Sequence, residues 1–172
     1  VNSYAQTGQA ITNVTIIHVM NPNEFTPGQT VLILRGKIGR IGATKDVKVP
    51  KGFTTIDGTG KFLIPGLWDM HVHLSYYGEE ALQLLIANGV TAVRDMGGDI
   101  KQIDQWRKDI QDGKINGPMI FRAGPFVDGS KKMDAKRKSF TKVVKNEKDG
   151  RAVVGELKSL KVDFIKRHSR VP

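Results

Sequence analysis

Two histidines, His71 and His73, stand one residue apart at the end of an apolar run and are the clearest candidates for chemistry in the chain. The run from Phe62 to Met70 is nearly continuous in apolar side chains, which is typical of a strand covered on both faces. Because side chains alternate along a strand, the two imidazoles are expected on one face, about 6–7 Å apart. Asp69 shares their parity and is a third polar group for that face. The pattern predicts a site for one divalent cation, and the alternative is a pair of structural histidines in the core.

Polar side chains also follow the later strands that the sequence predicts. We expect strands at residues 62–70, 90–93, 119–123 and 162–166. Helices are expected at 78–88, 100–112, 139–144 and 151–160, with a break at Gly150. This alternation predicts a parallel sheet or barrel, whose active site lies at the carboxyl ends of the strands. The side chains that fall there, besides the two histidines, are Arg94, Asp95, Arg122, Lys166 and His168.

Lys166 is the hardest of these residues to explain, because an unpaired ammonium is costly to bury at the end of an apolar strand. The simplest explanation is a lysine whose ammonium reaches the solvent at the rim. His168 shares the face parity of Lys166, which makes it a candidate metal ligand or anion contact. Asp95 is a candidate to fix a histidine tautomer or a neighbouring strand end, and the alternatives are pairing with Arg94 or a surface position.

Residues 1–60 follow a different pattern, with short strands rich in β-branched side chains. The strands are expected at 11–20, 30–34, 37–41 and 53–56, separated by turn signals. His18 lies among them and is expected to be structural or exposed. The overall prediction is an α/β fold, with a small β-sandwich portion at 1–60 followed by a partial barrel at 61–172. The second part supplies about four βα units, whereas a closed (β/α)8 TIM barrel has eight and about 250 residues.

The composition excludes several classes of protein. The chain has 172 residues, a net charge of +10 and no cysteine, so disulfides and thiolate metal sites are excluded. No run of about 18 apolar residues occurs, and no membrane-spanning helix is expected. The basic residues between Lys131 and Lys148 have Phe140 as their only aromatic neighbour. A solvated surface is therefore favoured over a nucleic-acid groove, and a basic protein that binds polyanions is a further alternative.

The N-terminus carries a weak targeting signal. The chain begins with Val1, and we expect that an upstream segment is removed or left out. Ser3-Tyr4-Ala5 resembles the small-x-small end of a signal-peptide cleavage site. An exported protein, periplasmic or secreted, and a cytoplasmic one are both open.

Two stretches form a long and specific motif, Asp57-Gly58-Thr59-Gly60-Lys61 and Ile64-Pro65-Gly66-Leu67-Trp68-Asp69-Met70-His71-Val72-His73-Leu74. The motif resembles the start of the barrel in the amidohydrolase superfamily. The resemblance is closest to the imidazolonepropionase-like and metal-dependent prolidase (Xaa-Pro or Xaa-Arg dipeptidase) branch. It implies a metal-dependent hydrolase on a (β/α)8 barrel beside a small β-sandwich, of which this chain is the N-terminal portion.

The resemblance also implies roles for single residues. Residues 162–166 resemble the strand-four motif whose lysine is carboxylated by CO2. The carbamate on Lys166 would then bind one or two divalent ions, with Zn²⁺ expected, together with His71 and His73. Asp95 matches the family pattern and is expected to act behind the metal ligands. Arg167-His168 departs from the apolar and aromatic residues of relatives, so the resemblance assigns no substrate-carboxylate contact there.

The implied reaction is hydrolysis of a C–N bond in a small amide, dipeptide or cyclic amide by metal-activated water. The family's remaining metal ligands and its general base come from later strands. No catalytic residue is therefore assigned within these 172 residues, and the chain alone is expected to be inactive. The alternative function is a non-catalytic truncated barrel module that binds metal or assembles with another chain. Because four strands cannot close a barrel, we expect a homo-oligomer or pairing with the missing C-terminal half.

Overall fold

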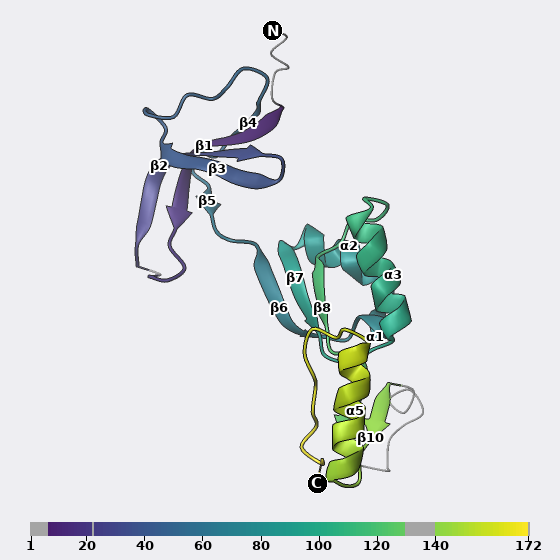
Figure 1. The fold of residues 1–172 in the computed structure, drawn as a ribbon. Coiled ribbons are helices and arrows are strands. Elements are labelled where there is room, and N and C mark those ends of the chain that lie inside the picture. The colour runs from purple at the N-terminus through teal and green to yellow at the C-terminus, as the bar shows by residue number, and fades with distance from the viewer. Residues whose placement is uncertain (1–6, 22, 130–139, 172) are drawn as a thin grey trace. The chain divides into compact units, whose positions relative to one another are not determined.

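The computed structural model describes residues 7–21, 23–129 and 140–171 (Figure 1). The chain divides into two compact units, Val1–Pro65 and Gly66–Pro172, where the sequence predicts a boundary between residues 60 and 61. Within the described residues, no helix is long and apolar enough to cross a membrane. The signal-like residues 3–5 and the basic residues 131–138 lie outside the described part of the chain.

The first unit contains one five-stranded sheet where the sequence predicts a sandwich. Its strands are β1 (Gly8–Ile17), β2 (Phe25–Leu34), β3 (Lys37–Ala43), β4 (Thr54–Asp57) and β5 (Phe62–Leu63). β1, β2 and β3 pair antiparallel in sequence order, and both β4 and β5 pair parallel with β1. Ala10, Val14 and Val31 are the buried apolar side chains of this sheet. The antiparallel meander therefore follows the β-branched pattern of the sequence.

The apolar run from Phe62 to Met70 is not one buried strand, so that prediction is wrong. It is divided between β5, which pairs with β1, and β6 (Leu67–Val72), which belongs to the second unit. Pro65 lies between the two strands and has no N–H that could continue a ladder. Gly66 follows because a side chain there would overlap Thr91. The apolar side chains at the start of β6 are also about half exposed, at 49% for Leu67, 52% for Trp68 and 48% for Met70.

The second unit begins with a parallel sheet in the order β6, β7 (Val90–Asp95) and β8 (Met119–Arg122). Helices α1 (Leu74–Tyr77) and α2 (Glu80–Ala87) connect the first two strands, and α3 (Ile100–Gln111) connects the second two. Figure 1 shows α2 and α3 on one side of this sheet. The core between them consists of Leu74, Leu82, Val93, Ile103, Trp106 and Ile120. Repeated βα units that cover one sheet face are the arrangement of a partial barrel, which confirms the predicted α/β fold class.

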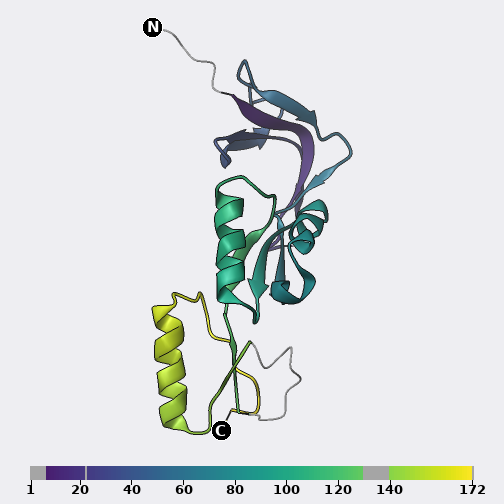
Figure 2. The same cartoon turned by 90° about the vertical axis from the view of Figure 1, so that its right-hand side faces the viewer.

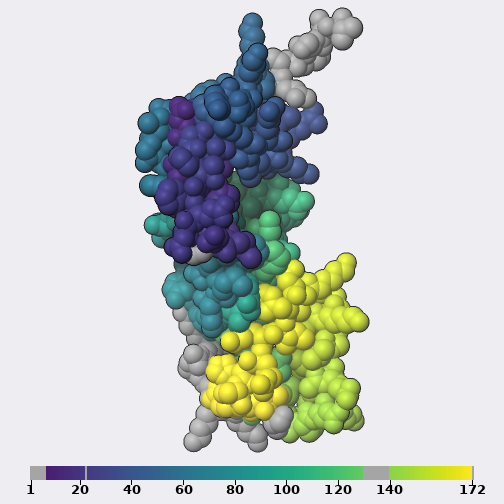
Figure 3. All heavy atoms as spheres, turned by 90° about the vertical axis from the view of Figure 1, so that its left-hand side faces the viewer, coloured from purple at the N-terminus to yellow at the C-terminus, as the bar shows by residue number. Residues whose placement is uncertain are grey.

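A second layer of the same unit consists of β9 (Phe126–Asp128), β10 (Thr141–Val143) and α5 (Glu147–Ser159). β9 and β10 pair parallel, and α5 lies beside them (Figure 2). Leu157 of α5 packs against Val127 and Val144. The C-terminal segment, yellow in Figure 3, lies beside α5, where Val162 packs against the same cluster.

Two helix predictions in this region are wrong. In the predicted helix at 139–144, β10 forms instead, because Thr141 to Val143 pair with β9. Residue 139 lies outside the described residues. The predicted break at Gly150 is absent, because α5 starts at Glu147 and runs through it. Asn146 caps the helix by accepting a hydrogen bond from Asp149 N at 2.9 Å, and one glycine costs a helix only about 1 kcal/mol.

The predicted fourth strand at 162–166 does not form a regular ladder, so it is wrong in detail. Asp163 N donates to Arg122 O at 3.0 Å, and an isolated parallel bridge joins Val127 to Arg167. Between these points the Asp163 carboxylate accepts from Arg122 N at 2.8 Å, which occupies a donor that a ladder would use. The segment nevertheless lies beside β8 and β9, in the place of the next barrel strand.

Candidate metal and ligand site

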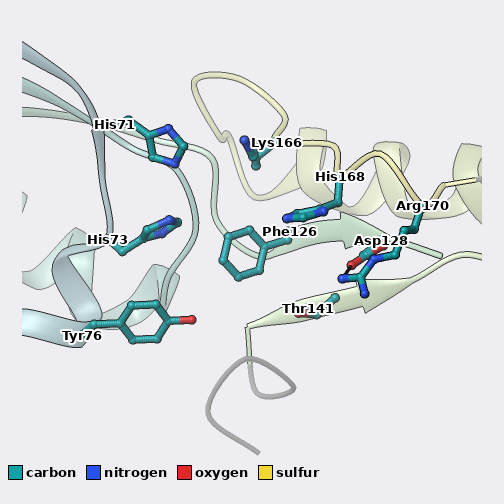
Figure 4. Close-up of a pocket in the computed structure, with 9 residues that line it drawn as sticks. All are labelled: His71, His73, Tyr76, Phe126, Asp128, Thr141, Lys166, His168 and Arg170. Atoms are coloured by element: carbon teal, nitrogen blue, oxygen red, sulfur yellow. Dashed lines mark hydrogen bonds and ion pairs between the residues drawn. The ribbon is translucent and has the colours of Figure 1, made fainter. Parts of the chain in front are cut away.

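One pocket of about 250 Å³ brings most of the predicted site residues together. It lies at the carboxyl end of β6 and beside β9 and β10, within the second unit. Figure 4 shows the two histidines on one side and the charged residues of β9 and the C-terminal segment on the other. Its lining residues are His71, His73, Tyr76, Phe126, Asp128, Thr141, Lys166, His168 and Arg170.

The rings of His71 and His73 face each other edge to face, with 5.3 Å between their centroids. His73 follows the last residue of β6, and its Nδ1 lies 3.0 Å from Gly97 O. A ring that donates from Nδ1 to a carbonyl carries its lone pair on Nε2, which is the tautomer that binds metals. Burial, and next the positive charge of Lys166, lower the pKa of His71. The His71 ring is therefore suited to the neutral form that a divalent ion requires.

Asp95 fastens the end of β7 to the turn that carries His73. Its side chain is fully buried and accepts hydrogen bonds from Leu74 N at 2.8 Å and Gly97 N at 3.1 Å. Burial raises the pKa of this carboxyl, while the two N–H groups act in the opposite direction. The same Gly97 accepts from His73 through its carbonyl, so Asp95 sets the position of both partners of that hydrogen bond.

Gly97 and Phe126 close the wall behind His73. Gly97 has φ +145°, and a Cβ there would lie 2.6 Å from Phe126 Cδ1. The Phe126 ring in turn contacts the His73 ring edge to face, with 5.4 Å between centroids. Only glycine fits this position, because both its backbone conformation and its neighbour exclude a side chain.

Comparisons with known proteins give this geometry a context. No family model matches the chain. An imidazolonepropionase of Vibrio cholerae is 30% identical over 153 residues, which is 86% of this chain and 35% of that protein. A dihydroorotase of Geobacter metallireducens is 33% identical over 115 residues, which is 59% of this chain and 26% of that protein. Among solved structures, a protein of Bifidobacterium longum superimposes on 98% of this chain and 42% of its own, with a TM-score of 0.85 and 23% identity.

The chain belongs to the amidohydrolase superfamily. A prolidase solved with N-methylphosphonate-L-proline has a TM-score of 0.74 and 19% identity, over 93% of this chain and 46% of that one. The chain therefore spans about a third or less of the curated amidohydrolases named above and under half of these solved chains.

In this amidohydrolase chain, Lys166 and His168 line the pocket opposite the two histidines. Their main chain is held by β9, because Val127 N donates to Lys166 O and His168 N donates to Val127 O, both at 2.9 Å. Both side chains are half-buried, and the burial alternates along 162–168 as in an extended segment. The shared face of Lys166 and His168 is therefore retained without a regular strand.

Two other sequence interpretations need correction, and Asp69 lies in a neighbouring cavity. Asp69 does not line this pocket, but it lines a second cavity of about 290 Å³ together with His71 and His73. Its carboxylate instead accepts from His71 N at 3.0 Å, beside the pocket. Arg122 turns away from the pocket and forms two hydrogen bonds to Asp104 on α3, at 2.6 and 2.8 Å.

The pairing of Arg94 with Asp95 is also absent from the described contacts. The Arg94 guanidinium lies over the Phe164 ring at 4.8 Å, while Asp95 is turned into the core. Neighbouring residues of one strand point to opposite faces, which separates the two side chains.

Several pocket residues were not predicted from the sequence. Asp128 is 2% exposed and forms an ion pair with Arg170, with 2.6 Å between Oδ2 and Nη2. A polar residue after the apolar pair Phe126-Val127 was the available signal for Asp128. Arg170 shares the face parity of Lys166 and His168, but its partner lies 42 residues away, so the sequence does not indicate the ion pair.

Proposed function

We propose that this chain is the N-terminal part of a metal-dependent amidohydrolase that hydrolyses a C–N bond of a small amide, dipeptide or cyclic amide. The observation that carries the proposal is the convergence of His71, His73 and Lys166 on one pocket. The names of the relatives, imidazolonepropionase and dihydroorotase among curated proteins and Xaa-Pro dipeptidase among solved structures, support the class of reaction.

The donor set fits a divalent ion in part. The His73 ring keeps Nε2 free of the Gly97 carbonyl, and the His71 ring lies beside it at 5.3 Å between centroids. Among the described residues, no group of three His, Cys, Asp or Glu side chains could hold a metal. A third ligand from this chain would have to be Lys166, which as an ammonium has no lone pair to offer. Carboxylation of Lys166 would turn it into an oxygen ligand.

Bound Zn²⁺, as one ion or two, would supply a Lewis acid for the carbonyl and acidify a water molecule. The residues of this chain would hold and orient the ions. His73 is fixed by Gly97 and Asp95, and Lys166 is fixed by the main chain of β9. We further propose that the remaining ligands and the general base come from outside these residues, so that the chain alone is inactive.

Assembly and location are part of the same proposal. Within the described residues, the parallel sheet ends in β6 on one side, and on the other side β8 is followed by the extended segment at 162–167. Met119 of β8 is 61% exposed. We propose that a second copy or the remaining half of the barrel covers these edges. A periplasmic or secreted location and a cytoplasmic one are both compatible with it.

The proposal is tested by metal content. The purified chain is incubated with zinc chloride, freed of excess metal by gel filtration, and analysed by mass spectrometry of the metal. We expect bound zinc in the wild-type chain and its loss in His71→Gln and in His73→Gln. His18→Gln is the matched control, because His18 bonds Thr26 Oγ1 at 2.9 Å in the first unit. Zinc content that is the same in all three variants would reject the site.

Two further measurements test the carboxylation of Lys166 and the hydrolase activity separately. Isotope-labelled bicarbonate should give a carbamate signal in carbon NMR that Lys166→Arg removes. The polypeptide completed with the rest of its coding region should hydrolyse dipeptides or cyclic amides, whereas residues 1–172 should not. A completed polypeptide that binds zinc but hydrolyses none of these substrates would favour the non-catalytic module.

A further inference from the structure

Arg94 of β7 is a strand-end cation that the proposed metal site does not use. Val93 and Ile120 belong to the core under α2 and α3, so Arg94 and its register partner Phe121 lie on the opposite face of the sheet. We call this the inner face of the sheet. Phe121 stacks there on Trp68, with 5.2 Å between the ring centroids. Arg94 is therefore a cation next to aromatic side chains.

The Arg94 guanidinium has an aromatic partner from a distant part of the chain. Its Cζ lies 4.8 Å from the centroid of the Phe164 ring, within the limit of about 6 Å for a cation–π contact. Nη2 lies 3.5 Å from Met96 Sδ, which helps to orient the side chain. The ion pairs among the described residues do not include Arg94, which is half-buried. In the described part of the chain, the Phe164 ring is therefore the strongest partner of this charge.

Phe164 lies two residues before Lys166 in the extended segment 162–167. Exposure alternates along this segment, and Phe164 and Lys166 share its more buried side. The main chain at Lys166 is bonded to β9, because Val127 N donates to Lys166 O at 2.9 Å. The Lys166 side chain then lines the pocket together with His71 (Figure 4). A displacement of the Phe164 ring is therefore passed on to Lys166 through the single residue between them.

The other side of the segment is held by different contacts. The Asp163 carboxylate accepts from Arg122 N at 2.8 Å and from Arg107 Nη1 at 3.2 Å. Neighbouring residues of an extended chain point in opposite directions, so Asp163 and Phe164 hold the segment from two sides. Contacts on one side alone leave an extended segment free to rotate about its own axis. The contact of Phe164 with Arg94 removes that freedom.

We propose that Arg94 is a positioning residue for Lys166 and acts through the Phe164 ring. The guanidinium holds the ring against the inner face, and the ring sets the direction from which Lys166 enters the pocket. The contact does not depend on the charge of Lys166, so it positions an ammonium and a carbamate alike. The inference rests on the proposed function for the role of Lys166 as a metal ligand.

Amide hydrogen exchange of the full chain tests the position of the segment without metal. The reporters are the N–H groups of Val127 and His168, which donate to Lys166 O and Val127 O. Arg94→Met removes the cation and Phe164→Leu removes the ring, and each should speed exchange at both amides about tenfold. A tenfold change corresponds to about 1.4 kcal/mol, which is the size of a partly desolvated cation–π contact. The double variant should exchange no faster than the single variants, because either change already removes the contact.

Two controls separate positioning from a general contribution to stability. The N–H of Ile103, which donates to Asp99 O in α3, is the reference amide of the same unit and should keep its exchange rate. Arg151→Met removes a cation from an exposed position on α5 and should change neither reporter. Exchange at Ile103 that rises as much as at His168 would overturn the proposal. Additive effects in the double variant, or unchanged exchange at Val127 and His168, would also overturn it.

A conservative variant gives a further check, because Arg94→Lys keeps a cation over the ring. It should restore slow exchange to within about threefold of the wild type. Exchange as fast as in Arg94→Met would show that the charge is not what holds the ring.

Zinc affinity, measured with bicarbonate present, tests whether the position of the segment matters for the metal site. Arg94→Met should weaken zinc binding about tenfold in the wild-type chain. It should have no effect in a Lys166→Gln background, because the residue that Arg94 positions is then absent. An equal loss in both backgrounds would show that Arg94 does not act through Lys166. A chain that binds no zinc would reject the proposed function, and the exchange measurements would still decide whether Arg94 positions the segment.

Discussion

Replacing Gly97 with alanine should damage the second unit more than its single added methyl group suggests. Gly97 lies between His73, which bonds its carbonyl, and Phe126, whose ring occupies the space of a Cβ. A change at this residue therefore affects both fold stability and the position of a proposed metal ligand. The expected result is a large loss of stability, together with weaker zinc binding.

The magnitude follows from two separate effects. A non-glycine residue at φ +145° is held in a sparsely populated conformation, which costs about 1–3 kcal/mol. The added methyl group would lie 2.6 and 2.7 Å from Phe126 Cδ1 and Cζ, and overpacking of this kind costs about 1–3 kcal/mol. We expect Gly97→Ala to lower the free energy of unfolding by about 2–6 kcal/mol, a large part of the stability of an ordinary domain.

Two other glycines are matched controls. Gly113 has φ +70° and no atom within 4 Å of the position that a Cβ would take, so Gly113→Ala measures the backbone cost alone, about 1–2 kcal/mol. Gly155 lies within α5 and is equally open, and Gly155→Ala should stabilise the helix by about 0.5–1 kcal/mol. In a Phe126→Ala background, Gly97→Ala should cost about 1–3 kcal/mol less than in the wild type, because the clash is gone.

Urea unfolding followed by tryptophan fluorescence measures these values. Both tryptophans of the chain, Trp68 and Trp106, belong to the second unit, so the signal reports on the unit that contains Gly97. If Gly97→Ala costs no more than Gly113→Ala, the contact with Phe126 carries no energy. If its cost is the same with and without the Phe126 ring, the proposed cause is refuted.

Three other predictions use the same protein. Asp104→Ala should destabilise the second unit by about 1–3 kcal/mol in the urea assay, because it leaves the buried Arg122 guanidinium without its carboxylate, and an unchanged midpoint would contradict this. Leu157→Ala should cost about 2–5 kcal/mol in the same assay, because the side chain is fully buried, and a loss below about 1 kcal/mol would show that the β9–α5 layer is loosely packed. The Thr59 hydroxyl and N–H lower the pKa of Asp57, so its stabilising effect is present above the unfolded-state pKa and lost as the pH falls through the folded-state pKa. Thr59→Val should raise the Asp57 pKa in an NMR titration, and an unshifted titration curve would exclude the hydroxyl as the cause.

The elements that the sequence predicts well are those whose apolar side chains repeat at a regular spacing. The helix expected at 100–112 is α3, Ile100–Gln111, and two members of its apolar stripe, Ile103 and Trp106, are buried. Asp99 begins it by accepting from Lys101 N and Gln102 N, which is a local signal that the sequence contains. Such elements depend on neighbours in the chain, so a single sequence is enough to find them.

The elements that were missed depend on partners distant in the chain. Residues 141–143 become a strand because they pair with β9, a contact that no local pattern encodes. The apolar run from Phe62 to Met70 contains a signal against a single strand, because Pro65 lies inside it and proline is rare within central strands. The apolar composition alone favours one strand.

The site residues also depend on partners distant in the chain. The contacts of Arg122 explain how Lys166 is positioned. The sequence marked Arg122 as a site residue because it ends a strand, yet its guanidinium is 5% exposed and bonds Asp104 and Leu160 O. Its backbone N–H bonds the Asp163 carboxylate at 2.8 Å, while Asp163 N bonds its carbonyl at 3.0 Å. These contacts hold residues 160–163 against β8, and the chain then continues in extended form to Lys166 beside the histidines. The strand-end arginine therefore acts as the anchor of the segment that brings the lysine into the pocket. A polar residue at the end of a barrel strand can thus either line the pocket or hold a neighbouring segment in place. The direction of its side chain decides between these two roles.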